Sequence, residues 1–337
     1  MVKQNKEDII QLTAAELTDF WKLYQYESLS WCGLTFFLTH VDDEQIRKLL
    51  EHGLQLTEKR KKIAVQYLKK ANYPIPQGFT EQDVILHAPR LFSDKLYLFY
   101  LLSTTQLEVV NYGEAVINAA RSDVIHEFYN ILVDSLHIHI EAKELMKEKG
   151  IFLRIPSIPP PNKTDFVRNE SFIKGWLGER RPLVGTEITN LTFNAKRNAL
   201  GQAVITAFSQ VVQSKEIQKY FKRGRDIARK HLDVFSNILK ENQLGDSVVS
   251  LSSEITDSTE PPFSDKLMLN FISILIPSGI GNYGLAVAMS PRRDIGIQYT
   301  RLIGEIAKYA EDGIELLIKN GWLEQPPTAI DREGLAK

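Results

Sequence analysis

The sequence contains two copies of one unit, and this repeat constrains the fold more than any other feature. The pentapeptide FSDKL at residues 92–96 recurs at 263–267, and the tripeptide NYG at 111–113 recurs at 282–284. Both recurrences have an offset of 171 residues. The same offset, carried along the chain without gaps, pairs residues 12–156 with residues 183–327. The chain is therefore expected to fold as a duplicated structure.

Residues between the two copies predict a domain boundary. The segment SIPPPNK at 157–163 holds three consecutive prolines, which cannot continue a helix and favour a stiff extended spacer. Phe172, Trp176 and Leu177 follow this spacer, so residues after it are expected to dock on a bundle. The predicted division is a first bundle at 1–156, a linker and docking segment at 157–182, and a second bundle at 183–337.

Apolar residues recur at helical spacing in four stretches of each copy. In the first copy, a capping box at Thr13 and Glu16 opens a helix that should end near His40. Further helices are expected at about 44–71, 93–119 and 122–149. Residues 72–91 lack the pattern and are broken by proline and glycine, as are residues 243–262 in the second copy. A connection of this length is typical of a crossover between parallel helices, so the predicted fold class is all-α, with two tandem ferritin-like four-helix bundles.

Charge and cysteine content exclude some classes of protein. The 41 basic residues are balanced by 42 acidic residues and alternate with them, which argues against a nucleic-acid partner. Cys32 is the only cysteine, so no internal disulfide can form and a reducing, cytoplasmic setting is predicted.

An apolar stretch in the second copy is long enough to cross a membrane. Residues 267–291 carry no charge, whereas the same helix of the first copy carries Glu108 and Glu114. The charged counterpart favours a helix buried on nearly all sides and no membrane partner. Pro277 falls inside this helix, where a kink is expected.

Histidines and acids do not complete a di-iron motif. Such a centre needs a glutamate three residues before a histidine on two helices, and none of the seven histidines has one. The nearest approaches are Asp123 with His126 and Asp134 with His137, and Lys308 occupies the position of His137 in the second copy. We therefore predict no metal, no cofactor and no catalytic residue. A single-metal site in the first copy remains as the alternative.

Two further motifs have structural explanations. Gly279, Gly281 and Gly284 match the spacing of a dinucleotide-binding loop, but no strand precedes them, so small residues at a close helix contact are the preferred interpretation. The repeated tripeptides are predicted to pack where the two bundles meet, because a duplicated unit commonly keeps the contact of an ancestral dimer. The alternative is that each packs within its own bundle. The candidate residues for inter-bundle packing are Asn111, Tyr112, Gly113, Asn282, Tyr283 and Gly284.

Several of these phrases resemble a known family. FSDKL, NYG, the tripeptide RRD at 292–294, the segment NGWLEQPP at 320–327 and ERRPL at 179–183 are similar to the domain-of-unknown-function family three-two-three-one (DUF3231) of spore-forming bacteria. The resemblance covers nearly the whole chain. It implies tandem ferritin-like bundles, and some relatives carry a spore-coat label. It supplies no catalytic residues.

The function predicted from these features is binding or assembly by a soluble helical-bundle protein. Protein partners or self-association are expected, with a cytoplasmic location and the spore coat as the alternative location. Two other classes stay open. One is a ferritin-like metal-binding protein or enzyme. The other is a small-molecule binder with an interhelical pocket lined by aromatic residues such as Trp21, Tyr24 and Trp31.

Overall fold

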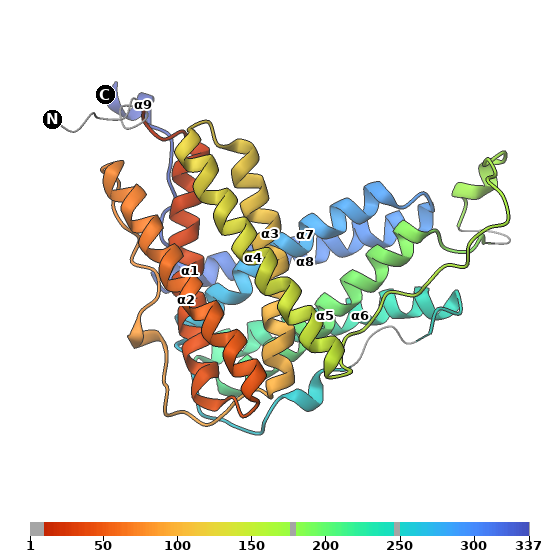
Figure 1. The fold of residues 1–337 in the computed structure, drawn as a ribbon, viewed down its shortest axis with the longest axis horizontal. Coiled ribbons are helices and arrows are strands. Elements are labelled where there is room, and N and C mark those ends of the chain that lie inside the picture. Colours follow the sequence, from red (N-terminus) through yellow and green to blue (C-terminus); the bar gives the residue numbers. More distant parts are fainter. Residues whose placement is uncertain (1–9, 176–179, 246–249, 337) are drawn as a thin grey trace.

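The repeated sequence folds into two bundles of four long helices, confirming the predicted fold class. The computed structural model describes residues 10–175, 180–245 and 250–336. The two bundles run in clearly different directions from a shared region (Figure 1). The first bundle comprises α1 (Ala14–His40), α2 (Glu44–Lys70), α3 (Asp94–Asn118) and α4 (Ser122–Glu148). The second comprises α5 (Gly185–Val211), α6 (Lys215–Glu241), α7 (Asp265–Met289) and α8 (Arg293–Lys319), and the short α9 (Arg332–Leu335) follows it.

Each bundle consists of two helical hairpins. In the first bundle α1 packs on α2 and α3 on α4, and the hairpins meet through α1 with α3 and α2 with α4. The long connections between the hairpins include the short helical turns η2 (Glu81–Asp83) and η4 (Ser252–Glu254). This order of contacts, with a long crossover after the second helix, is the ferritin-like arrangement.

The repeated acids explain how the hairpins are fastened together. The Asp94 carboxylate at the start of α3 accepts hydrogen bonds from the backbone amides of Asp42 and Asp43, at 3.2 and 2.8 Å, just before α2. Asp265 receives the same two bonds from Gln213 and Ser214 at 3.0 and 2.8 Å. Helix starts have unpaired amides and a positive dipole end, so one carboxylate here stabilises two helices. This explains why the pentapeptide is preserved in both copies.

Glu16 and Glu187 play the corresponding role at the other end of the bundles. The Glu16 carboxylate accepts hydrogen bonds from the backbone amides of Ala120 and Arg121, at 2.9 and 2.8 Å, next to the start of α4. It also forms the predicted capping box with Thr13. Glu187 accepts the backbone amide of Arg292 at 3.0 Å. Each acid thus ties the first helix of its bundle to the fourth.

The two crossovers pair with each other and reveal an internal two-fold symmetry. Val84 forms an antiparallel bridge with Phe263, and Phe92 forms one with Ile255. Val84 and Ile255 are equivalent in the repeat, as are Phe92 and Phe263. The backbone hydrogen bonds follow the same symmetry. The Ile85 amide donates to the Pro262 oxygen at 2.8 Å, and the amide of its equivalent, Thr256, donates to the Leu91 oxygen at 3.1 Å. The halves therefore meet as two subunits of a symmetric dimer would.

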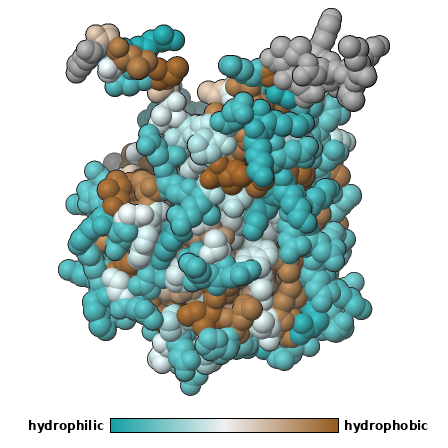
Figure 2. Space-filling model, turned by 90° about the vertical axis from the view of Figure 1, so that its left-hand side faces the viewer, coloured by the Kyte–Doolittle hydropathy of each residue, from teal (hydrophilic) through white to brown (hydrophobic). Residues whose placement is uncertain are grey.

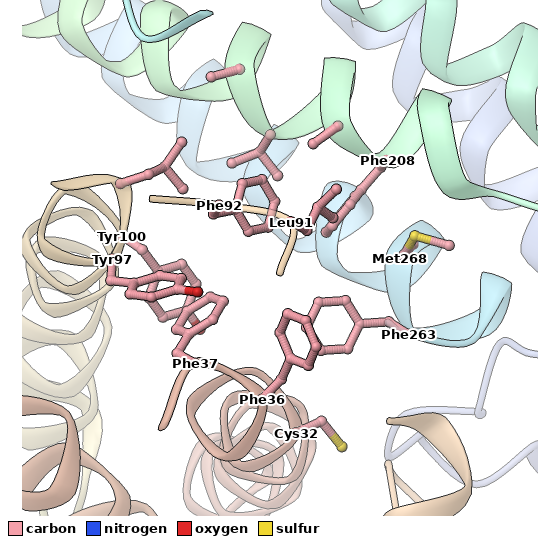
Figure 3. Close-up of a cluster of buried hydrophobic side chains, with 14 of the residues drawn as sticks. Cys32, Phe36, Phe37, Leu91, Phe92, Tyr97, Tyr100, Phe208, Phe263 and Met268 are labelled. Carbon is pink, nitrogen blue, oxygen red and sulfur yellow. The ribbon is translucent and has the colours of Figure 1, made fainter. Parts of the chain in front are cut away.

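Aromatic side chains fill the region around this internal axis. A single buried hydrophobic cluster includes residues of both bundles, among them Phe37 and Phe92 of the first and Phe208 and Phe263 of the second (Figure 3). Tyr100 of α3 stacks on Phe271 of α7 with ring centroids 6.0 Å apart, and these two residues are also equivalent in the repeat. The two bundles therefore share a core at their junction.

The chain that follows each fourth helix crosses to the other bundle. The Glu324 carboxylate accepts hydrogen bonds from the backbone amides of Gln77 and Gly78, at 2.8 and 2.6 Å. The equivalent residue after α4, Leu153, accepts a hydrogen bond from the Lys196 ammonium of α5 through its backbone oxygen. In the linker, the Arg181 guanidinium lies 4.1 Å from the centre of the Phe172 ring. Trp176 and Leu177 lie outside the described residues.

The side-chain hydrogen bonds of the NYG tyrosines lie within their own bundles, as the alternative interpretation expects. The Tyr112 hydroxyl donates to Glu27 of its own bundle at 2.8 Å, and Tyr283 accepts a bond from Asn198 of its own bundle at 2.7 Å. A Cβ added at Gly113 or Gly284 would meet no atom within 4 Å, so neither glycine makes a close helix contact. Of the six candidates, Asn111 borders a cavity of about 50 Å³ that α7 also lines, and Asn282 is half-buried.

The apolar helix α7 is less buried than its composition suggested. It is long and apolar enough to cross a membrane by length and composition, and only 22% of its most apolar window is buried. The expectation of burial on nearly all sides is therefore wrong. The helix continues through Pro277, and its buried residues lie near its two ends: Leu267, Met268, Leu269, Ile272, Tyr283 and Ala286. The molecular face in Figure 2 is mostly hydrophilic, with small separate hydrophobic patches.

Candidate ligand cavity in the second bundle

Charged residues from four helices meet in the middle of the first bundle. Arg60 of α2 lies at the centre, with its Nη1 3.4 Å from Glu27 of α1 and 3.0 Å from Glu108 of α3. Its Nη2 donates to Ser135 of α4 at 2.8 Å, and the Ser135 hydroxyl donates to Glu108 at 2.8 Å. All four helices thus contribute to one polar cluster in the core of the first bundle.

Burial of the charged groups in this cluster costs free energy and shifts the pKa of Glu27. Glu27 and Arg60 are 1% and 3% exposed. Removal from water raises the pKa of Glu27 to about 7, although the Arg60 charge opposes the rise and Tyr112 donates a hydrogen bond to the carboxylate. A buried charge is tolerated only with partners, because an uncompensated one costs several kcal/mol. The guanidinium therefore serves as the cation of this site, and its charge repels a metal ion.

The equivalent positions of the second bundle carry different chemistry. Asn198 stands in place of Glu27, His231 in place of Arg60, and Gly279 in place of Glu108. Tyr283 retains the tyrosine and links the neighbours, since its hydroxyl lies 2.7 Å from Asn198 Nδ2 and 3.1 Å from His231 Nδ1. The other histidine nitrogen lies 3.1 Å from Glu305. Hydrogen bonds among Asn198, Tyr283 and His231 thus take the place of the Arg60 ion pairs, and the Glu305 carboxylate that contacts His231 also pairs with Lys230.

The loss of large side chains leaves a cavity in the second bundle. It measures about 130 Å³, whereas the equivalent positions of the first bundle line two smaller cavities of about 20 and 50 Å³. Gly279 removes the side chain supplied by Glu108, and Gly201 and Ala228 replace Ser30 and Thr57. Residues of α3 close one side, so the first bundle forms part of the wall. The principal wall residues are Tyr100, Thr104, Leu200, Val204, Ile227, Phe271, Leu275, Ile276 and Ile306.

Arg197 of α5 is the charged residue of this cavity wall. Its Nη2 donates to the Ser278 hydroxyl at 3.0 Å, and its guanidinium lies 5.8 Å from the centre of the Phe193 ring. Within the described part of the chain, Arg197 forms no ion pair with a carboxylate. Burial lowers the pKa of Arg197, but a guanidinium stays protonated in proteins. The cavity therefore has a positive charge without a negative partner among these residues.

Two polar atoms of the wall residues also lack partners. The Oδ1 atom of Asn194 and the hydroxyl of Tyr309 are buried and have no hydrogen-bond partner. Asn194 is 1% exposed and Tyr309 4% exposed, so bulk water does not reach them. Unpartnered buried polar groups are costly in a protein. Together with Arg197 they give an apolar cavity polar groups with unused bonding capacity, which is typical of a ligand site.

Acidic and histidine side chains of the first bundle that a metal site would need have ion pairs or hydrogen bonds with other residues. Asp134 lies 3.1 Å from Lys59, and Glu141 lies 3.4 Å from His52 on the surface. His126 contacts the backbone oxygen of Ser122 on its own helix at 2.6 Å. Within the described residues, no group of three or more histidine, cysteine, aspartate or glutamate side chains is placed to hold a metal ion. The prediction that the protein binds no metal stays a prediction.

Cys32 and the α7 glycines form no catalytic site in the described structure. Cys32 is fully buried, and burial raises the pKa of its thiol to about 12, so it is poorly suited to act as a nucleophile. Gly279, Gly281 and Gly284 lie inside helix α7, not in a phosphate-binding loop. A Cβ at Gly281 or Gly284 would meet no atom within 4 Å, and the nearest atom to one at Gly279 is 3.9 Å away. Gly279 serves to leave space rather than to admit a neighbouring helix.

The aromatic residues proposed for a pocket do not line this one. Trp21, Tyr24 and Trp31 are partly buried on α1, and the Trp31 ring lies 5.4 Å from the Lys61 ammonium. Sequence reasoning missed Arg197 and Asn198. Aligning the two copies could have revealed them, because Tyr26 aligns with Arg197 and Glu27 with Asn198. This signal is weak, because every position from Asp19 to Ser28 differs between the two copies.

Comparison with known proteins gives one family and one structural neighbour. The model of DUF3231, a protein family of unknown function, matches residues 2–164 and again 171–335. A crystal structure described as a "putative spore coat protein" from Bacillus halodurans is 19% identical, with a TM-score of 0.41, over 48% of this chain and 100% of that one. No curated protein matches the sequence.

Proposed function

Because the chain belongs to the DUF3231 family of proteins of unknown function, we propose a function from its own geometry: the protein binds a small, largely apolar molecule in the cavity of the second bundle. The supporting observation is the difference between equivalent positions. A cavity of about 130 Å³ is close to the size that accepts benzene in other proteins. The first bundle shows that the same backbone can be filled, so the space in the second bundle follows from its side chains.

Toluene is a suitable first probe for this cavity. Titration into the full chain, followed by NMR and thermal unfolding, should show saturable binding and an increase in Tm, because a ligand that binds only the folded state stabilises it. The chemical-shift changes should be centred on α5, α6 and α7.

A cavity-filling variant tests the location. Gly279→Leu places a side chain in the space that Glu108 occupies in the first bundle, and it should abolish toluene binding. Gly284→Leu is the matched control, since it adds the same side chain to the same helix where a Cβ meets no atom within 4 Å. Both variants gain helix propensity, so only the loss of binding distinguishes them. Toluene binding that survives Gly279→Leu would refute the proposed site.

A protein-binding role in the spore coat is a separate proposal. Its structural support is a set of exposed apolar side chains on the packed helices α3 and α4: Val110, Ile117, Tyr129 and Ile140 are each more than half exposed. Large apolar side chains exposed on a surface are candidates for protein contacts. Fractionation of sporulating cells should place the protein in coat extracts, and Ile117→Lys with Ile140→Lys should release it. Recovery of the wild-type protein only from membranes would contradict this proposal.

A further inference from the structure

We propose that the cavity of the second bundle selects small monocarboxylates, with the carboxylate bound by Arg197 and an apolar body of about the size of a benzene ring held among α5, α6 and α7. This inference rests on the proposed binding function and adds the charge and chemical class of the ligand.

The charge balance of the two bundles favours an anion. The first bundle surrounds its central Arg60 with two carboxylates, Glu27 and Glu108. The second bundle lacks both, because asparagine and glycine stand in their places, yet it gains a cation at Arg197. A guanidinium in an apolar wall is unfavourable without an anion. A bound carboxylate would supply the charge that the second bundle lacks.

The donors around Arg197 fit a carboxylate. A guanidinium presents planar, paired donors that match the two oxygens of a carboxylate. The Ser278 hydroxyl lies 3.0 Å from Arg197 Nη2, so it is positioned to take part in the same network. Asn198 uses its amide nitrogen for both Tyr283 and the Asn194 backbone, each at 2.7 Å. These bonds hold the polar end of the cavity in place.

The rest of the wall fits an apolar body. Leu200, Ile227, Leu275 and Ile276 line the cavity, and Phe271 and Tyr100 close it at the bundle junction. Arg197 is mostly buried but keeps some contact with solvent. A ligand with one charged end and one apolar end would therefore place its charge towards Arg197 and water.

Three probes of similar shape separate charge recognition from cavity filling. Benzoate, benzamide and toluene are titrated into the full chain at pH 7 by calorimetry or NMR. Benzoate should bind about 10- to 100-fold more tightly than benzamide, which is the usual gain from a charge-assisted hydrogen-bond pair. Arg197→Met should remove this preference and leave toluene affinity within about twofold. Arg301→Met is the control, because Arg301 is exposed on α8 and pairs with Gln298.

The binding results distinguish a failure of the carboxylate inference from a failure of the proposed cavity function. Equal affinity for benzoate and benzamide in the wild-type protein would overturn the inference, while toluene binding would leave the proposed cavity function standing. Failure of all three probes to bind would overturn both. A benzoate preference that persists in Arg197→Met would assign the anion to another residue and refute the role of Arg197. The wild-type comparison does not depend on the folding of any variant.

Discussion

The centres of the two bundles have the same backbone arrangement but are lined by side chains of different charge and size. Arg60, Glu27 and Glu108 form an ion-pair cluster in the first, whereas His231, Asn198 and Gly279 stand at these positions in the second, beside a cavity of about 130 Å³ whose wall holds Arg197. The capping acids Asp94 and Asp265, in contrast, are identical in the two copies. Residues that connect the helix ends are therefore shared between the copies, while residues at the bundle centre differ.

The agreement at the junction has a physical basis. Each crossover is the pairing partner of its own equivalent, so a change in one half alters the surface that the other half must match. The bundle centres have no such restraint, because each is enclosed mainly by its own four helices. One copy could therefore acquire a cavity without disturbing the shared core around Phe92 and Phe263.

The largest expected effect comes from removing the central cation of the first bundle. Arg60→Met leaves Glu27 and Glu108 buried without their partner and should lower the free energy of unfolding by about 3–5 kcal/mol. Urea denaturation measures this loss. Lys59→Met is the control, since the exposed Lys59–Asp134 pair should contribute about 1 kcal/mol or less. Equal losses in the two variants would show that the buried cluster does not stabilise the bundle.

A smaller effect should appear in the pH dependence of the first bundle. Burial raises the pKa of Glu27 from 4.5 to about 7, so the folded state binds more protons than the unfolded state between these values. Its contribution to stability is fully present below pH 4.5 and is lost as the pH rises through 7. Relative to Glu27→Gln, the wild-type protein should lose roughly 1–3 kcal/mol between pH 5 and 8. Parallel stability curves for the two proteins would contradict the assignment.

The smallest effect should have the opposite sign in the second bundle. Burial lowers the pKa of His231 below 6.5, although the hydrogen bond to Glu305 opposes this and Lys230 and Arg301 reinforce it. The contribution of His231 to stability is then present above pH 6.5 and is lost as the pH falls through the folded-state pKa. Relative to His231→Gln, the wild-type protein should lose about 1 kcal/mol or less on acidification from pH 7 to 5. A gain on acidification would contradict the neutral histidine.

The sequence predicted the helices well and the site poorly. The capping box at Thr13, the positions of both crossovers and the duplication could all be derived from local patterns and the constant offset. The packing of the NYG motifs could not, because a tyrosine beside a glycine fits a helix contact within a bundle as well as one between bundles. Likewise, α7 is apolar nearly all round, but composition does not say which sides a neighbouring helix covers.

The duplicated all-α architecture could be derived from the sequence, because helical periodicity, capping and breaker residues are local properties that occur in both copies. The three-dimensional structure was needed to show that the crossovers pair about an internal two-fold axis and that α3 of the first bundle closes a cavity in the second. It also placed Arg197 in that cavity wall without a carboxylate partner among the described residues. These features depend on which side chains from distant segments occupy or leave the same space, and packing and charge compensation in three dimensions determine that outcome.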